Sequence, residues 1–238
     1  MIGLGTIVNA AAVVVGAVLG MLFHGGLKER FQSIVMKAIG LSVIFIGISG
    51  ALENMLVVTD SGVAATGTME IIIAMVIGGL LGEWIDIEKR MEQFGEFLKK
   101  KIRSKNDPFF VEGFVSASLI ICIGAMAVVG AIQDGIFGDW SLLATKAVLD
   151  FIIIMVMTCS LGKGCAFSAI PVLIFEGVIT VFASFLKPVM TELAMDYLSL
   201  IGSILIFCVG LNLVWGKKIR VANMLPAVVL AVAAAFMI

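Results

Sequence analysis

The sequence has few charged residues for its size, since only 14% of its 238 residues are Asp, Glu, Lys or Arg. Soluble domains carry about 25% charged residues. The formal net charge is −1, so the chain has no excess of basic residues for binding a polyanion. These shortages argue against a soluble domain and against nucleic acid as a partner.

Histidine and cysteine are also scarce. His24 is the single histidine, and no pair of the four cysteines forms a C-x-x-C motif. The cysteines lie within or beside apolar blocks, which favours buried apolar side chains over disulfides or a zinc site. No Walker loop, haem motif or hydrolase-type pairing of nucleophile and base occurs. We therefore expect neither an enzyme nor a cofactor.

Apolar residues are abundant, at 61%, and they fall into separate blocks of about the 20 residues that span a bilayer as a helix. The blocks do not alternate in polarity as barrel strands would. The sequence therefore predicts an all-α, polytopic transmembrane helix bundle with about eight spans. The spans are expected at 4–23, 38–58, 69–87, 111–132, 144–161, 167–186, 197–216 and 222–238. The fifth and sixth could instead form one long element broken at 162–164.

The basic residues predict the orientation of these spans. If the N-terminus is outside, every Lys and Arg except Lys146 and Lys187 falls on the inner side, as expected for cytoplasmic loops. Both termini are then extracytoplasmic. No basic stretch or cleavage site precedes the first block, so 1–23 is expected to be a retained span. The segment 88–105 predicts a cytoplasmic amphipathic helix, either a topology-fixing basic loop or a surface for anionic lipid or a partner.

Two internal similarities suggest repeats. Residues 50–84 align with 130–164 without a gap, and IGLSVIF at 39–45 resembles IGSILIF at 201–207. The second pair lies on spans that run in opposite directions, which is typical of inverted-repeat transporters. We expect one membrane domain, 1–238, with repeat units at about 1–87 and 165–238 linked by 88–164. Glycine pairs such as Gly16 and Gly20 permit close packing within the bundle or in a homo-oligomer.

Polar residues inside the apolar blocks are the candidate site residues, because ionisable groups at membrane depth usually face a cavity or a partner. Glu176 lies near the middle of the sixth span, where it could exchange a proton, bind a cation or hydrogen-bond a neighbouring helix. Pro171 removes a backbone donor on the same span. Ser168 belongs to a polar, glycine-rich break between spans five and six that could bind an anion or form a tight loop.

Four further residues extend this set. Asp150 and Glu70 occupy matching positions of the first repeat alignment and could form an outer acidic vestibule, or lie at the interface in contact with water. Asn9 and Asn212 are amides within apolar spans that could bind an ion or polar solute, or join helices by hydrogen bonds. We expect Asn9 and Asn212 to approach Glu176 from symmetry-related helices.

Three motifs carry a family resemblance: GTIVNAAAVVVGAVLG at 5–20, GKGCAFSAIPVLIFEG at 162–177 and IRVANMLPA at 219–227. With these motifs the whole chain resembles the YdfK/YqgA-type family of bacterial and archaeal inner-membrane proteins of unknown function. The resemblance implies a prokaryotic plasma membrane and supplies no activity. Glu176 departs from the neutral residue, such as Gln, expected there, so the resemblance fits a polar contact at this position better than obligatory proton transfer.

These observations favour a transporter or permease for an ion or small solute, with the bilayer as its surroundings and cation or proton coupling as an option. The alternative is a non-transporting membrane sensor, assembly factor or scaffold that uses 88–105 as its contact surface. A water-filled path to Glu176 would favour the first function.

Overall fold

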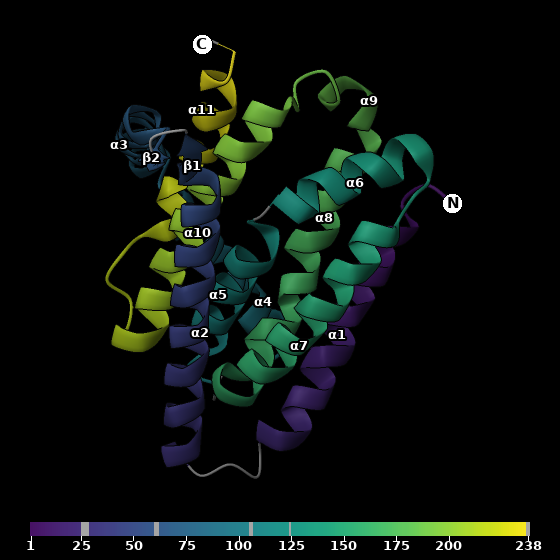
Figure 1. Ribbon diagram of the computed structural model, residues 1–238. Helices are drawn as coiled ribbons and strands as arrows, with labels where there is room; N and C mark the ends of the chain where they lie inside the picture. The colour runs from purple at the N-terminus through teal and green to yellow at the C-terminus, as the bar shows by residue number, and fades with distance from the viewer. Residues whose placement is uncertain (25–28, 60–61, 105–106, 124, 237–238) are drawn as a thin grey trace. The chain divides into compact units, whose positions relative to one another are not determined.

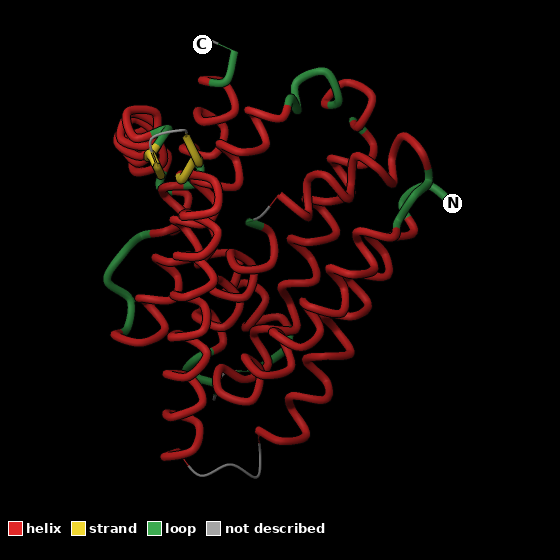
Figure 2. Tube along the Cα trace, in the orientation of Figure 1, coloured by secondary structure: helices red, strands yellow, loops and turns green. Residues whose placement is uncertain are grey.

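The computed structural model describes residues 1–24, 29–59, 62–104, 107–123 and 125–236, and they are overwhelmingly helical (Figure 2). This confirms the predicted all-α class. The α-helices are α1 (Leu4–His24), α2 (Glu29–Met55), α3 (Thr68–Ile85), α4 (Ile87–Lys101), α5 (Phe110–Cys122), α6 (Ala125–Phe137), α7 (Ser141–Leu161), α8 (Ala169–Val181), α9 (Ala183–Leu186), α10 (Glu192–Trp215) and α11 (Pro226–Ala234). Two 3₁₀ helices, η1 (Gly162–Ser168) and η2 (Val221–Met224), precede α8 and α11.

A small antiparallel hairpin joins α2 to α3, which the sequence reasoning did not predict. Its strands are β1 (Leu56–Thr59) and β2 (Gly62–Ala65), paired from Leu56 with Ala65 to Thr59 with Gly62. The predicted amphipathic helix is confirmed as α4, which ends in three consecutive lysines.

The chain divides into two compact units. Unit 1 comprises Met1–Ile39, Arg90–Cys122 and Met126–Lys187, and unit 2 comprises Gly40–Lys89, Ile123–Ala125 and Pro188–Ile238. Each unit combines segments from both halves of the chain, so the units do not coincide with the repeat units predicted at 1–87 and 165–238. Repeat symmetry itself stays a prediction.

In unit 1, α1 and α7 pack side by side and run parallel (Figure 1). Gly5 of α1 lies against Leu143 near the start of α7, whereas Gly16 lies against the backbone of Phe151 further along it. A Cβ atom at Gly16 would stand 3.2 Å from the Phe151 Cα, so only glycine permits this approach. The Gly16 and Gly20 pair thus serves packing within unit 1.

The rest of unit 1 folds back along α7. η1 packs against α5, where Gly113 lies against Leu161 and Cys165, and α8 then returns antiparallel to α1. The break between α7 and η1 occurs at Gly162, whose positive φ of 74° suits a glycine. Because α7 runs parallel to α1 and α8 runs antiparallel to it, the chain reverses direction between these two helices. The alternative of one long element broken at 162–164 stays a prediction.

In unit 2, two antiparallel helix pairs pack through glycines. Gly47 of α2 lies against Phe207 of α10, and Gly78 of α3 lies against Ala227 of α11. The buried residues of α3 are confined to Ala74, Gly78 and Gly82, so one narrow stripe faces the protein. Most of the remaining apolar side chains of α3 are exposed, as expected for a helix that faces lipid.

Five helices of the described residues are long and apolar enough to cross a membrane, or six if α5 and α6 together form one broken span. The eight predicted spans differ from this count for local reasons. Spans five and six lie in the single stretch Ser141–Val181, and the last span is shortened to the apolar helix of Val221–Ala234. The number eight therefore stays a prediction.

Candidate functional site

A buried lysine lies at the centre of a polar cluster in unit 1. Lys146, one turn before Asp150 on α7, is 6% exposed, and Asp150 is 4% exposed. The Lys146 ammonium forms an ion pair and hydrogen bond with Asp150 and lies 3.5 Å from Glu176 Oε1. It also donates to the carbonyl of Ile121 at 2.8 Å. Each of the three ammonium N–H groups can therefore be assigned an oxygen partner.

The carbonyl of Ile121 accepts this bond because α5 ends at Cys122. The last carbonyls of a helix have no partner within the helix, and together they carry a partial negative charge. The break between α5 and α6 thus supplies one of the three oxygen atoms around Lys146.

Glu176 enters the cluster from α8 and is 1% exposed. Its Oε1 atom accepts a 2.7 Å hydrogen bond from Asn9 Nδ2 of α1, which is fully buried. One helical turn away, the hydroxyl groups of Thr6 and Thr180 are hydrogen-bonded to each other at 3.4 Å. Helices α1, α7 and α8 and the end of α5 therefore converge on one set of polar side chains.

Two buried oxygen atoms of this cluster have no hydrogen-bond partner among the residues that the structure describes: Glu176 Oε2 and Asn9 Oδ1. An unpartnered buried acceptor costs about 1–3 kcal/mol, so such atoms are rare unless a ligand, water or proton satisfies them. The cluster consequently combines fixed charges with free acceptor capacity, which suits the binding of a proton, a cation or a hydrogen-bond donor.

A second buried carboxylate, Asp134 of α6, caps the N-terminal end of α1. Its Oδ1 accepts from the Gly3 amide at 3.1 Å, and its Oδ2 accepts from the Gly5 amide at 2.9 Å. The first amides of a helix are unpaired and carry partial positive charge, which a carboxylate stabilises. Asp134 thereby fixes the end of α1 that also carries Asn9.

Asp134→Asn is expected to destabilise the protein by about 1–2 kcal/mol, since an amide offers one acceptor where the carboxylate offers two. Thermal unfolding of the purified protein in detergent measures the loss. Glu53→Gln, the same chemical change on an exposed residue, is the control. Equal unfolding temperatures for wild type and Asp134→Asn would show that this cap contributes nothing.

The structure thus brings together three of the residues predicted from the sequence, Asn9, Asp150 and Glu176. Asp150 is buried against Lys146, which corrects the expectation of a water-exposed interfacial carboxylate. Glu70 lies in the first turn of α3 in unit 2 and is partly exposed, so the shared vestibule stays a prediction.

Pro171 and Ser168 have local structural roles. Pro171 lies in the first turn of α8, a position at which its missing backbone donor is tolerated. The Ser168 hydroxyl donates to the Cys165 carbonyl at 2.6 Å within η1. Their predicted part in a pathway stays a prediction.

Asn212 is occupied by its own loop in unit 2. Its Oδ1 accepts from the amides of Lys218 and Ile219, and its Nδ2 donates to the Ile219 carbonyl. These bonds join Asn212 to the segment that follows α10, and its expected part in binding an ion or polar solute stays a prediction.

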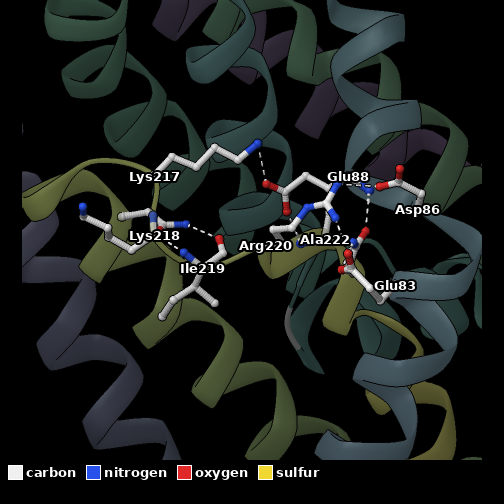
Figure 3. A network of polar contacts seen from close by, with 10 residues as sticks. Glu83, Asp86, Glu88, Lys217, Lys218, Ile219, Arg220 and Ala222 are labelled. Atoms are coloured by element: carbon white, nitrogen blue, oxygen red, sulfur yellow. Dashed lines mark hydrogen bonds and ion pairs between the residues drawn. The ribbon is translucent and has the colours of Figure 1, made fainter.

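A second polar network lies in unit 2 (Figure 3). Arg220 bonds to Glu83 and, at 2.6 Å, to Asp86. Desolvation alone would lower the pKa of Arg220, but the carboxylates of Asp86 and Glu83 outweigh it, so the pKa is raised and the guanidinium stays charged. Lys217 pairs with the buried Glu88 at 2.7 Å.

Backbone groups complete this second network. Glu88 Oε2 accepts from the Ala222 amide at 3.1 Å, and the Glu88 amide donates to Asn223 Oδ1 at 2.7 Å. The Asn223 amide nitrogen in turn donates to Glu83 at 2.6 Å. These matched pairs join the end of α3 and the start of α4 to η2, which is a structural role.

Sequence reasoning missed Lys146 and Asp134 as site residues, because Lys146 was expected at the outer end of a span and Asp134 in an outer loop. One signal was present: Lys146 and Asp150 are four residues apart, the spacing at which side chains meet on a helix. The contact between Asp134 and α1 has no such signal, since it joins residues more than 120 positions apart.

Comparisons with known proteins agree with the membrane character. The chain is 29% identical to the Bacillus subtilis (strain 168) "Uncharacterized membrane protein YdfK" over 98% of this chain and 96% of that protein. It is 32% identical to the Escherichia coli (strain K12) "Uncharacterized protein YqgA" over 96% of this chain and 94% of that protein. No solved structure matches. Residues 4–236 match the family described as "Protein of unknown function (DUF554)", and the chain belongs to this family.

Proposed function

We propose that the protein is a transporter or permease for a small ion or solute, with the cluster around Lys146 as its binding site. The observation that carries the proposal is the pair of unpartnered acceptor oxygens on Glu176 and Asn9, buried among helices of an apolar bundle. Polar groups at such positions are costly and usually line a pathway. A scaffold has no need for buried acceptors without partners.

The packing within each unit supports an inverted-repeat design. Repeat units at about 1–87 and 165–238 would relate α1, α2 and α3 to α8, α10 and α11. All three pairs pack antiparallel: α1 on α8, α2 on α10, and α3 on α11. A twofold axis in the membrane plane would place related helices in this way, and many secondary transporters use such an axis for alternating access.

The directions of the helices also fit the proposed orientation. With the N-terminus outside, α1 and α7 run inward and α8 runs outward, in agreement with the parallel and antiparallel contacts of unit 1. In unit 2, the antiparallel contacts of α2 with α10 and of α3 with α11 fit the same assignment. We infer a multi-pass protein of the prokaryotic plasma membrane with both termini extracytoplasmic.

Ion and proton flux into sealed liposomes tests the proposal. We expect Glu176→Gln to reduce flux at least about tenfold, equivalent to about 1.4 kcal/mol, because the amide replaces one of two acceptor oxygens with a donor. Glu53→Gln, which makes the same change on an exposed residue of α2, should retain wild-type flux. Equal flux in all three proteins would remove Glu176 from the mechanism.

A non-transporting sensor or scaffold is the second candidate, and α4 supports it. Phe97 is 55% exposed beside Lys101, whose ammonium lies 5.8 Å from the ring centroid, and three lysines end the helix. An apolar face bordered by basic residues suits a membrane surface or an acidic partner. Absence of flux across a broad panel of ions and solutes would favour this function.

A further inference from the structure

The two unpartnered oxygens belong to groups that are already joined by one hydrogen bond. Asn9 donates through Nδ2 to Glu176 Oε1, which leaves Oδ1 on the same amide and Oε2 on the same carboxyl group. Both remaining atoms are acceptors whenever Glu176 is ionised, so they cannot bond to each other. Whatever satisfies them must carry positive charge or donate hydrogen bonds.

The charge balance of the cluster limits which ligands can satisfy these two oxygen atoms. Lys146 supplies one positive charge, whereas Asp150 and Glu176 together supply two negative charges when ionised. Uncompensated charge is strongly unfavourable in a buried site. The ionised cluster therefore lacks one positive charge, which either a proton on Glu176 or one monovalent cation would provide.

We propose that Glu176 Oε2 and Asn9 Oδ1 bind one small monovalent inorganic cation, in competition with a proton on Glu176. This inference rests on the proposed function and specifies its ligand. In the protonated state, the new O–H group is a donor for which Asn9 Oδ1 is a free acceptor. When the cation enters, the Oε2–H bond breaks, the proton leaves to water, and the charge of the cluster is unchanged.

The chemistry of the surroundings favours a monovalent cation over a metal ion of higher charge. A divalent cation would leave the cluster with excess positive charge beside Lys146. The hydroxyl oxygens of Thr6 and Thr180 lie one turn from Asn9 and Glu176 and add neutral oxygen atoms of the kind that hard cations prefer.

Proton release on cation binding is the most direct test. Sodium, lithium or potassium chloride is added to the purified, detergent-solubilised protein in weak buffer, with choline chloride as the ionic-strength control. We expect ~one proton released per cation bound, and an apparent cation affinity that falls about tenfold for each unit decrease of pH while the two compete. Calcium and magnesium chloride should release no more than choline chloride.

The pH dependence of proton release must be assigned to Glu176 and distinguished from the titration of other groups that face Glu176 and Asn9. Lys146 and Asp150 face it from α7, and the Cys122 thiol at the end of α5 interacts electrostatically with all three charged groups. Asp134 of α6 lies toward the N-terminal end of α1, bonded to the amides of Gly3 and Gly5. Glu176→Gln should abolish proton release, whereas Glu53→Gln should leave it at the wild-type level.

Asn9→Ala is the second variant, because it removes one proposed ligand and keeps the carboxyl group. We expect it to weaken cation binding at least about tenfold while the protein still elutes as a folded species. The proposed cation site would be wrong if protonation of the wild type did not depend on the cation. It would also be wrong if proton release survived in both Asn9→Ala and Glu176→Gln. A response to calcium or magnesium alone would overturn the monovalent assignment.

The flux assay distinguishes failure of this inference from failure of the proposed function. Solute flux without cation-linked proton release would leave the transporter standing and overturn the cation site. Cation-linked proton release without flux in liposomes would leave the cation site standing and contradict transport.

Discussion

Lys146→Met is expected to destabilise the protein by about 3–5 kcal/mol, the usual consequence of removing one partner from a buried ion pair. The substitution keeps an unbranched side chain of similar length and removes the ammonium. It leaves the carboxyl groups of Asp150 and Glu176 without their cation and the Ile121 carbonyl without its donor. The loss should shrink as the pH falls, because protonation neutralises the two carboxyl groups.

Thermal unfolding in detergent across a pH series measures this effect. The matched control is the double variant Lys146→Met with Asp150→Asn, which removes one negative charge together with the positive one. We expect the double variant to be more stable than the sum of the two single effects predicts, by about 0.5–3 kcal/mol, as for contacting residues in one network. Additive effects would show that the two side chains do not stabilise each other.

Gly78→Ala is expected to destabilise unit 2 by about 1–3 kcal/mol through overpacking. A Cβ atom at this position would meet the backbone of Ala227 and lie 2.7 Å from the Ala227 Cβ. Because the obstacle is a neighbouring helix and not the end of a flexible side chain, α3 and α11 must separate to admit one methyl group. The same purified protein and unfolding assay measure the effect.

The adjacent Gly79 offers the control for this prediction. A Cβ atom at Gly79 meets nothing within 4 Å, although both glycines lie in the middle of α3. Gly79→Ala should therefore be neutral or slightly stabilising, by at most about 1 kcal/mol, since alanine favours the helix. If the two variants unfold alike, close packing of α3 on α11 is not what Gly78 provides.

The sequence was sufficient to predict the helices and part of the site. Apolar blocks of membrane-spanning length have no other stable backbone conformation than a helix, which explains why the all-α class was predictable. Asn9 and Glu176 could be selected for a similar reason, because a polar side chain in an apolar block needs a partner. The identity of that partner is a matter of tertiary packing: Glu176 bonds to Asn9, whereas Asn212 bonds to Lys218 and Ile219 of its own loop.

The remaining features depend on long-range contacts that a single sequence does not encode visibly. The span was predicted to begin at residue 144, which placed Lys146 near the interface. Helix α7 instead begins at Ser141, three residues earlier. That extension moves Lys146 inward by about 4–5 Å at 1.5 Å per residue. Helices α7 and α8 lie within one apolar stretch, Ser141–Val181, and α7 ends at Leu161, directly before Gly162, beyond which the polypeptide reverses direction.

The bond between Asn9 and Glu176 also sets an order of events during synthesis, since the two residues are 167 positions apart. A ribosome adding about 5–20 residues per second needs roughly 8–30 s to supply Glu176 after Asn9. For most of that interval α1 has no α7 to pack against, and until its end α1 lacks the Glu176 side chain of α8, so the Asn9 amide must be shielded by other means. Nascent chains arrested before α8 should therefore expose α1 to cross-linkers directed at residue 9. Until α8 is made, α1 should also be accessible to quality-control proteases and to any insertase that holds polar helices.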